Sequence, residues 1–235
     1  MTKDHYISKD LRSGIISGLP IVFGYFPVAM AFGLLAKNTQ VSLRDSSLFS
    51  LFVFAGASQF MALDLIQAGI TAGNIILATF LLNLRHLMMS ASLSVRLKEI
   101  KKYWLVFIAF GVTDETFSVT SLGNRNLSVP FLLALHGVSY ASWVLGTIAG
   151  YLLGAILPVT VQSSLGIGLY ALFVALLVPE IKKSIPVLFL SLFSGIVYAV
   201  ISYFRLVPAS WSLVITIIVA SLVGVLLIKE EAQKA

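Results

Sequence analysis

Residues 75–93 read IILATFLLNLRHLMMSASL, an apolar run of membrane-spanning length that holds Asn83, Arg85 and His86 near its centre. A charged side chain in the middle of a span costs about 2.5–3.5 kcal/mol on insertion scales. A chain that keeps Arg85 there is expected to give it a partner, a substrate or a water-filled cavity. This run therefore predicts both a membrane span and a functional site.

The composition places the whole chain in the membrane. Hydrophobic residues make up 58% of the 235 residues and charged residues 11%, and the mean hydropathy is +0.98, far above that of a soluble domain. The net charge of +6 fits basic cytoplasmic loops. No basic stripe interleaves with aromatics, which argues against nucleic-acid binding. The absence of cysteine excludes disulfides and thiolate metal sites.

Uncharged runs predict an all-α polytopic membrane protein that fills residues 1–235 as a single transmembrane domain. These runs cover 13–36, 46–63, 65–84, 103–113, 126–179, 184–204 and 206–228. Since a span needs about 20 apolar residues, 126–179 must hold two. We therefore expect six to eight membrane-embedded helical elements within the lipid bilayer.

Basic residues set the predicted orientation. Arg96, Lys98, Lys101 and Lys102 fix the middle of the chain on the cytoplasmic side, and both termini are predicted to be cytoplasmic as well. If 14–36, 46–70 and 72–95 each crossed fully, this basic loop would lie outside. If 104–121, 130–155 and 163–179 each crossed fully, Lys182 and Lys183 would lie outside as well. We therefore predict that 46–70, interrupted at residues 56–59, and 163–179 are re-entrant.

This arrangement predicts two inverted repeats, 14–95 and 130–204, each with a broken or re-entrant segment. The segments 14–36 and 130–155 would then run in opposite directions. Inverted repeats with interrupted helices are typical of secondary transporters, whose sites form where the broken segments meet. The alternative is a series of plain spans.

An acidic partner for Arg85 comes from Asp114 and Glu115. Adjacent residues of a helix point to different faces, so one carboxylate can pair with Arg85 while the other faces a substrate or proton pathway. A buried ion pair that only fixes helix packing is the open alternative. Gln59 and Asn83 add neutral amides, which can bind a substrate or another helix.

Two histidines lie within apolar runs. His86 is a candidate proton relay, because imidazole titrates near physiological pH, and His136 is a weaker one. A structural histidine that is hydrogen-bonded to a carbonyl is the alternative for both.

Enzymatic motifs do not occur in the sequence. There is no His-Glu-x-x-His zinc motif and no Walker glycine loop for ATP. Gly56-Ala57-Ser58 lacks the following glycine of a serine nucleophile motif. We expect neither an enzyme nor a cofactor.

Four motifs occur in a specific order and spacing. They are Gly18-Leu19-Pro20 continuing into Gly24-Tyr25-x-Pro27, Phe54-x-Gly56-Ala57-x-Gln59-Phe60, Asn83-x-Arg85-His86, and Thr113-Asp114-Glu115-x-Phe117. In this respect the chain resembles the AzlC/YgaZ family of branched-chain amino acid permeases over nearly its whole length.

That resemblance implies a permease domain over 1–235, in a multi-pass protein of the cytoplasmic membrane. It further implies the large subunit of an ion-gradient-driven exporter of leucine, isoleucine and valine, which works with a small AzlD-type membrane subunit. By the same resemblance, the family's polar positions on this chain are Gln59, Asn83, Arg85, His86, Asp114 and Glu115. From their chemistry we infer that Gln59, Asn83, Arg85, Asp114 and Glu115 are the substrate-binding candidates and that His86 is the candidate proton relay. A non-transporting membrane scaffold or accessory subunit is the alternative.

Overall fold

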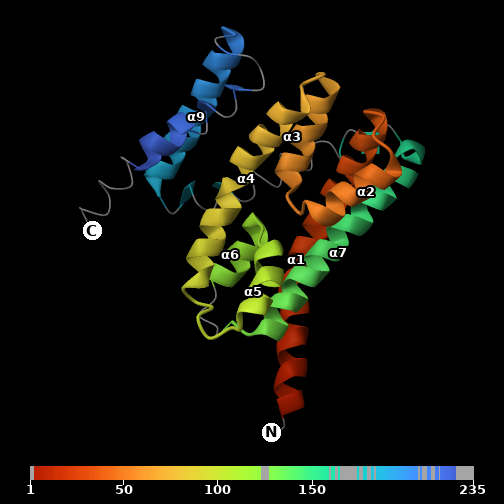
Figure 1. The fold of residues 1–235 in the computed structure, drawn as a ribbon, viewed down its shortest axis with the longest axis vertical. Helices are drawn as coiled ribbons and strands as arrows, with labels where there is room; N and C mark the ends of the chain where they lie inside the picture. The colour runs from red at the N-terminus through yellow and green to blue at the C-terminus, as the bar shows by residue number, and fades with distance from the viewer. Residues whose placement is uncertain are drawn as a thin grey trace. The chain divides into compact units, whose positions relative to one another are not determined.

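The computed structural model describes residues 3–122, 127–158 and 184–205, together with residues 160–161, 164, 174, 177–178, 181–182, 207, 211–212, 215–216 and 218–225. These residues form helices and no strand (Figure 1). The predicted all-α class is therefore confirmed for the described part of the chain.

The helices fall into two length classes. The long ones are α1 (Lys3–Asn38), α4 (Ala72–Ser94), α7 (Val129–Leu153) and α9 (Ile185–Tyr203), and these four are long and apolar enough to cross a membrane. The short ones have 9 to 12 residues, well below the roughly 20 needed for a crossing: α2 (Leu43–Phe52), α3 (Gly56–Gln67), α5 (Lys102–Phe110) and α6 (Asp114–Leu122). A 3₁₀ turn, η1 (Gly154–Ile156), follows α7.

The count of six to eight embedded elements stays a prediction. The predicted segment 163–179 lies largely outside the described residues, and the predicted segment 206–228 lies partly outside them. Re-entry of 163–179 is therefore left as a prediction too.

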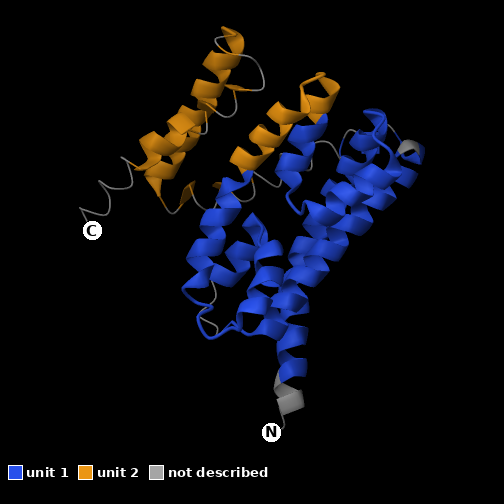
Figure 2. Cartoon of the chain, viewed as in Figure 1, with its two compact units in different colours: residues 1–63, 83–170 blue, residues 64–82, 171–235 orange. Residues whose placement is uncertain are grey.

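The chain divides into two compact units (Figure 2). Unit 1 contains residues 1–63 and 83–170, and unit 2 contains residues 64–82 and 171–235. In unit 2, α3 ends in a turn closed by the bond from Ile70 N–H to the Leu65 carbonyl (3.0 Å), with Gly69 at a φ of 69°. Elsewhere in unit 2, α9 packs on Gly224 through Leu190.

Small residues hold α1 against α7 in unit 1, where the two helices lie side by side (Figure 1). A Cβ added to Gly146 would lie 2.7 Å from the Ala29 Cβ, and one on Gly150 would overlap the Met30 backbone. Small-xxx-small spacings allow this backbone approach, because in a membrane helices associate through close packing. The glycines at 146, 150 and 154, four residues apart, therefore mark the main helix–helix contact of this unit.

The order of these contacts shows that α1 and α7 run in the same direction. Gly14 lies against Phe131, Ala29 against Gly146, and Leu34 against Gly154. Residue numbers therefore rise in the same direction along the two helices. The predicted opposite directions of 14–36 and 130–155 are therefore wrong, and the inverted pairing of these two helices is not present.

An interrupted helix pair, α2 and α3, fills one end of the α1–α7 pair. From the C-terminal end of α1, α2 descends until its Leu51 carbonyl accepts a bond from the Tyr140 hydroxyl (2.8 Å). The chain then turns at residues 53–55, and α3 returns until Leu63 packs against Phe32 and Ala36. The segment predicted to be interrupted does break and turn back, but its break lies at 53–55, and residues 56–59 form the first turn of α3.

Gly56 therefore serves close packing rather than the interruption. A Cβ on Gly56 would lie 2.5 Å from the Trp143 ring. The glycine lets the start of α3 approach that ring.

A second interrupted pair, α5 and α6, fills the other end. The pair departs six residues after Arg96 and returns to it, since the Arg96 guanidinium donates to the Thr120 carbonyl at the end of α6 (2.6 Å). The Ser128 hydroxyl, just before α7, donates to Asp10 near the start of α1. Residues 104–121, which we expected to cross, instead turn back at residues 111–113. This return is the reason α7 runs parallel to α1.

Candidate functional site

Aromatic rings line the place where the two interrupted pairs meet. Phe54 comes from the α2–α3 break and Phe110 from the end of α5, and their ring centroids lie 6.4 Å apart. Tyr140 packs edge-on against both, at 5.4 and 5.5 Å. Tyr25 of α1 packs edge-on against Phe54 (5.9 Å) and against Trp143 (5.3 Å). Two helix breaks therefore converge in one aromatic cluster midway along α1 and α7.

The first turn of α6 is locked by two threonines. The Thr113 N–H donates to the Thr116 hydroxyl oxygen (2.8 Å), and the Thr116 N–H donates to Thr113 Oγ1 (3.3 Å). The Thr116 hydroxyl also donates to the Gly111 carbonyl (2.9 Å). This reciprocal capping begins the helix at Asp114 and Glu115, where the positive end of the helix dipole stabilises carboxylates.

Arg85 pairs with Asp114, one of the two acids that the sequence analysis offered as its partner. Arg85 Nη1 lies 2.8 Å from Asp114 Oδ2, and the two side chains are 32% and 31% exposed. Arg85 Nε is buried and has no hydrogen-bond partner among the described residues. The pair is therefore accessible enough to exchange partners. The Nε–H group of the guanidinium remains available as a hydrogen-bond donor.

Glu115 takes the other face of α6, as expected for the neighbouring position. Its carboxylate accepts a hydrogen bond from the Tyr25 hydroxyl, which also lies 2.7 Å from Thr113 Oγ1. Tyr25 is buried, with 4% of its surface exposed. Tyr25 thus connects α1 to the start of α6, a role that the sequence analysis did not assign.

The amide of Gln59 is occupied at both ends. Its Nε2 donates to Ser50 Oγ (3.0 Å), and its Oε1 accepts from the Trp143 indole N–H (2.8 Å). Ser50 Oγ also lies 2.7 Å from Thr147 Oγ1. This network ties α2, α3 and α7 together around the α2–α3 break. Sequence reasoning missed Ser50, Trp143 and Thr147, because isolated small polar or aromatic residues in apolar helices carry no periodic signal.

Asn83 and His86 lie on α4 on either side of Arg85 in sequence. Asn83 Nδ2 donates to Ser58 Oγ (3.0 Å), while its buried Oδ1 has no partner among the described residues. His86 is half-buried. The structure thus brings four of the predicted site residues to the two helix breaks: Asn83, Arg85, Asp114 and Glu115. Among the described residues, the acceptor Asn83 Oδ1 and the donor Arg85 Nε have no hydrogen-bond partner.

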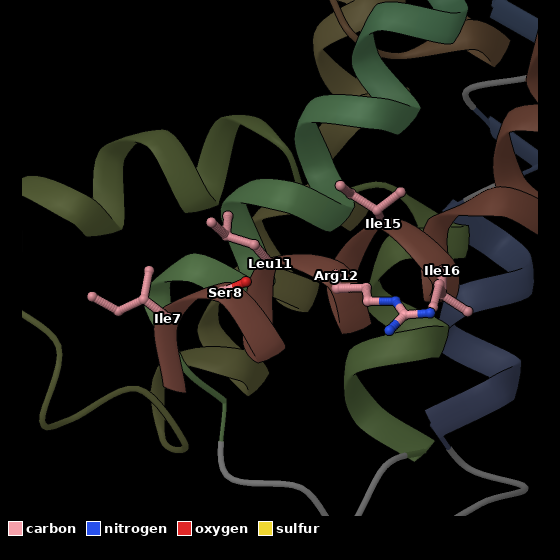
Figure 3. Close-up of a pocket in the computed structure, with 6 residues that line it drawn as sticks. All are labelled: Ile7, Ser8, Leu11, Arg12, Ile15 and Ile16. Carbon is pink, nitrogen blue, oxygen red and sulfur yellow. The ribbon is translucent and has the colours of Figure 1, made fainter. Parts of the chain in front are cut away.

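An open apolar groove lies elsewhere, along the N-terminal half of α1 (Figure 3). All the residues that line it belong to α1 and precede Tyr25: Ile7, Ser8, Leu11, Arg12, Ile15 and Ile16. It is separate from the Arg85–Asp114 pair. The described residues include no group of three or more histidine or acidic side chains placed to hold a metal ion.

Apolar helices arranged around two interrupted segments and an ion pair define an integral membrane protein. The chain belongs to the AzlC family, since the profile of the AzlC protein matches residues 20–157. This range contains Tyr25, Gln59, Arg85, Asp114 and Glu115.

Relatives of the chain are named as membrane and transport proteins. It is 39% identical over 182 residues to a membrane protein of Archaeoglobus fulgidus, covering 76% of this chain and 80% of the relative. It is 34% identical over 185 residues to the inner membrane protein YgaZ of Escherichia coli, covering 75% of each. It is 24% identical over 186 residues to the branched-chain amino acid transport protein AzlC of Bacillus subtilis, covering 78% and 72%. No solved structure matches the chain.

Proposed function

We propose that the chain exports branched-chain and similar apolar amino acids across the cytoplasmic membrane. It acts as a single permease domain over residues 1–235, the large subunit of an ion-gradient-driven transporter with a small AzlD-type subunit. The observation that carries this proposal is the Arg85–Asp114 pair at the start of α6, where the two helix breaks meet. Membership of the AzlC family and the name of the Bacillus subtilis relative support the substrate class.

A zwitterionic amino acid needs three kinds of contact. Its carboxylate needs a cation or a helix N-terminus, its ammonium an acid or a carbonyl, and its side chain an apolar wall. In our proposal Arg85 binds the carboxylate through a bidentate contact, which a guanidinium makes well. Asp114 and Glu115 receive the ammonium, and the Asn83 Oδ1 atom is a further acceptor. The aromatic cluster around Phe54 and Tyr140 forms the apolar wall.

Gln59 contributes to this site indirectly. Because protein partners occupy both ends of its amide, a substrate would have to displace Ser50 or Trp143 to reach it. We therefore propose that Gln59 holds the α2–α3 break in place beside the substrate. His86, next to Arg85, remains the proposed proton relay.

Leucine efflux from loaded vesicles tests the proposed function. We expect efflux when this chain is co-expressed with the small subunit and little when it is expressed alone. Co-expression should also raise the amount of the chain in the membrane. The absence of efflux in the presence of the small subunit would contradict the proposal and favour a scaffold or accessory role. The Gln59 network, which holds helices together through both ends of the amide, is the observation that favours this second function.

Cysteine labelling tests the topology that goes with this proposal. The chain contains no cysteine, so single cysteines can be introduced as Thr39→Cys, Glu99→Cys and Leu127→Cys and labelled one at a time. By the positive-inside rule we propose that 96–102 lies in the cytoplasm. The bond between Ser128 and Asp10 supports a start of α7 at the same end as the start of α1. In intact cells an impermeant maleimide should label position 39 and spare positions 99 and 127.

The Leu127→Cys variant is decisive for the direction of α7. If α5 and α6 together crossed the membrane, position 127 would lie outside. Labelling of position 127 from outside would therefore contradict the return of α6 to Arg96.

A further inference from the structure

His136 is a buried imidazole that the proposed substrate site does not use. It lies on α7 and is 4% exposed, and neither of its ring nitrogens has a hydrogen-bond partner among the described residues. An imidazole always carries at least one N–H, and leaving a buried polar group unpaired costs about 1–3 kcal/mol. A buried group of this kind is satisfied by an ordered water, by a bound ion, or in a second state of the protein.

The ring of His136 packs directly on the α5–α6 break. A Cβ added to Gly111 would overlap this ring. The Gly111 N–H donates to the carbonyls of Phe107 (3.3 Å) and Ile108 (3.1 Å) at the C-terminal end of α5. Carbonyls converge there, and this negative end of the helix stabilises a cation. Each carbonyl that is already bonded keeps a second lone pair.

No charged partner neutralises His136 among the described residues that pack around it. On α1 no ionisable residue precedes Tyr25 back to Ser13, and α5 has none from Trp104 to Phe110. The ionisable groups on the neighbouring helix faces are already engaged: Tyr25 with Glu115, Asp114 with Arg85, and the Tyr140 hydroxyl with the Leu51 carbonyl. A proton on His136 would therefore have the α5 carbonyls as its partners.

We propose that His136 is the proton-binding site that couples export to the proton gradient. This inference rests on the proposed transport function and assigns its coupling ion. One proton from the outer aqueous phase binds a free ring nitrogen when the break at 111–113 moves away from α7. The imidazolium then donates to the carbonyls at the end of α5, and the proton is released to the cytoplasm when the break closes.

Proton and substrate act on the same element from opposite sides. The break at 111–113 leads directly into Asp114 and Glu115, whereas Gly111 faces His136. When the break lies where a protonated His136 can donate to the α5 carbonyls, Asp114 and Glu115 are moved from the positions in which they receive the substrate ammonium. Proton and leucine therefore exclude one another, which is the requirement for exchanging an entering proton for a leaving amino acid.

Leucine binding as a function of pH tests this inference on the complex of the chain with its small subunit. In the wild type, the leucine affinity should fall by roughly 5- to 150-fold from about pH 8 to about pH 5, the range of a typical coupling between two ligands. In His136→Gln most of this pH dependence should be lost. His5→Gln, in the polar N-terminal stretch of the sequence, is the matched control and should behave as the wild type does.

Transport in proteoliposomes gives a second measurement. His136→Gln should retain leucine counterflow, which needs no net proton movement, and lose the acceleration of efflux by an imposed pH gradient. Retained counterflow also shows that the variant is folded. A third measurement needs no variant: leucine binding to the wild type in unbuffered solution should release protons.

Three results would overturn the inference. They are a wild-type-like pH dependence in His136→Gln, the loss of counterflow together with gradient-driven efflux in that variant, and wild-type leucine binding without proton release. A wild type that binds no leucine at any pH would refute the proposed function itself, which distinguishes the two failures.

Discussion

Replacing Arg85 by Gln is expected to destabilise the chain by about 1–3 kcal/mol, because it leaves Asp114 charged and without its partner. A fully buried pair would lose roughly 3–5 kcal/mol. We expect the smaller effect because both side chains are about a third exposed. Asp114→Asn should have a comparable effect, since it leaves the guanidinium unpaired.

The double variant Arg85→Gln/Asp114→Asn should recover much of this stability. Removing both charges leaves no uncompensated ion, and residues in direct contact show such non-additive effects. Thermal unfolding of the purified protein in detergent gives the three values. Arg85→Gln/Glu115→Gln is the matched control, because Glu115 bonds to Tyr25 and not to Arg85. If the Glu115 double variant recovers stability and the Asp114 double variant does not, the pairing is wrong.

Gly150→Ala should separate α1 from α7 and destabilise the chain by about 1–3 kcal/mol, the usual range for overpacking. The added Cβ would overlap the Met30 backbone, which cannot move aside as a flexible side chain can. Thermal unfolding and the yield of folded protein both measure this effect.

Gly137→Ala is the matched control on the same helix. A Cβ there meets no atom within 4 Å. Alanine is favoured over glycine within a helix by up to about 1 kcal/mol, so this variant should be as stable as the wild type or more so. Equal stability of the two variants would contradict the close α1–α7 contact.

The Arg85–Asp114 pair could be predicted from sequence because few charges occur within the apolar runs. An arginine in one run and two acids at the end of another leave few partners to choose from, and adjacent positions on a helix point to different faces. This reasoning did not select between Asp114 and Glu115. The choice depends on the capped start of α6, which sets the direction of each side chain.

The path of the chain between α4 and α7 could not be predicted in the same way. Basic residues give only the side on which a loop lies, so they constrain the number of crossings and not which segment turns back. Residues 104–121 have the length of a span, and the break at 111–113 contains no proline. Asp114 and Glu115 directly follow the break, but we interpreted them as partners of Arg85 and not as the end of a helix. We predicted a second turning segment at 163–179, which stays a prediction, and did not predict the return that the described residues show at α5 and α6.

The hydrogen bonds of Gln59 are a second feature that could not be predicted from the sequence. The glutamine itself stands out in an apolar stretch, but its partners Ser50 and Trp143 come from helices whose contacts depend on the fold. Packing of α2 and α3 against α7 determines that the amide is occupied, and sequence spacing contains no information about it.

Leucine binding to the Arg85→Gln/Asp114→Asn double variant tests most directly whether Arg85 holds the substrate. The double variant should fold and reach the membrane, so a loss of binding cannot be ascribed to an unpaired charge. We expect the wild type, with its small subunit, to bind leucine and the double variant to fail, because no neutral side chain gives a carboxylate a hydrogen bond as strong as that of a guanidinium. Wild-type-like binding by the double variant would reduce Arg85 to a structural residue and would contradict the proposed substrate site.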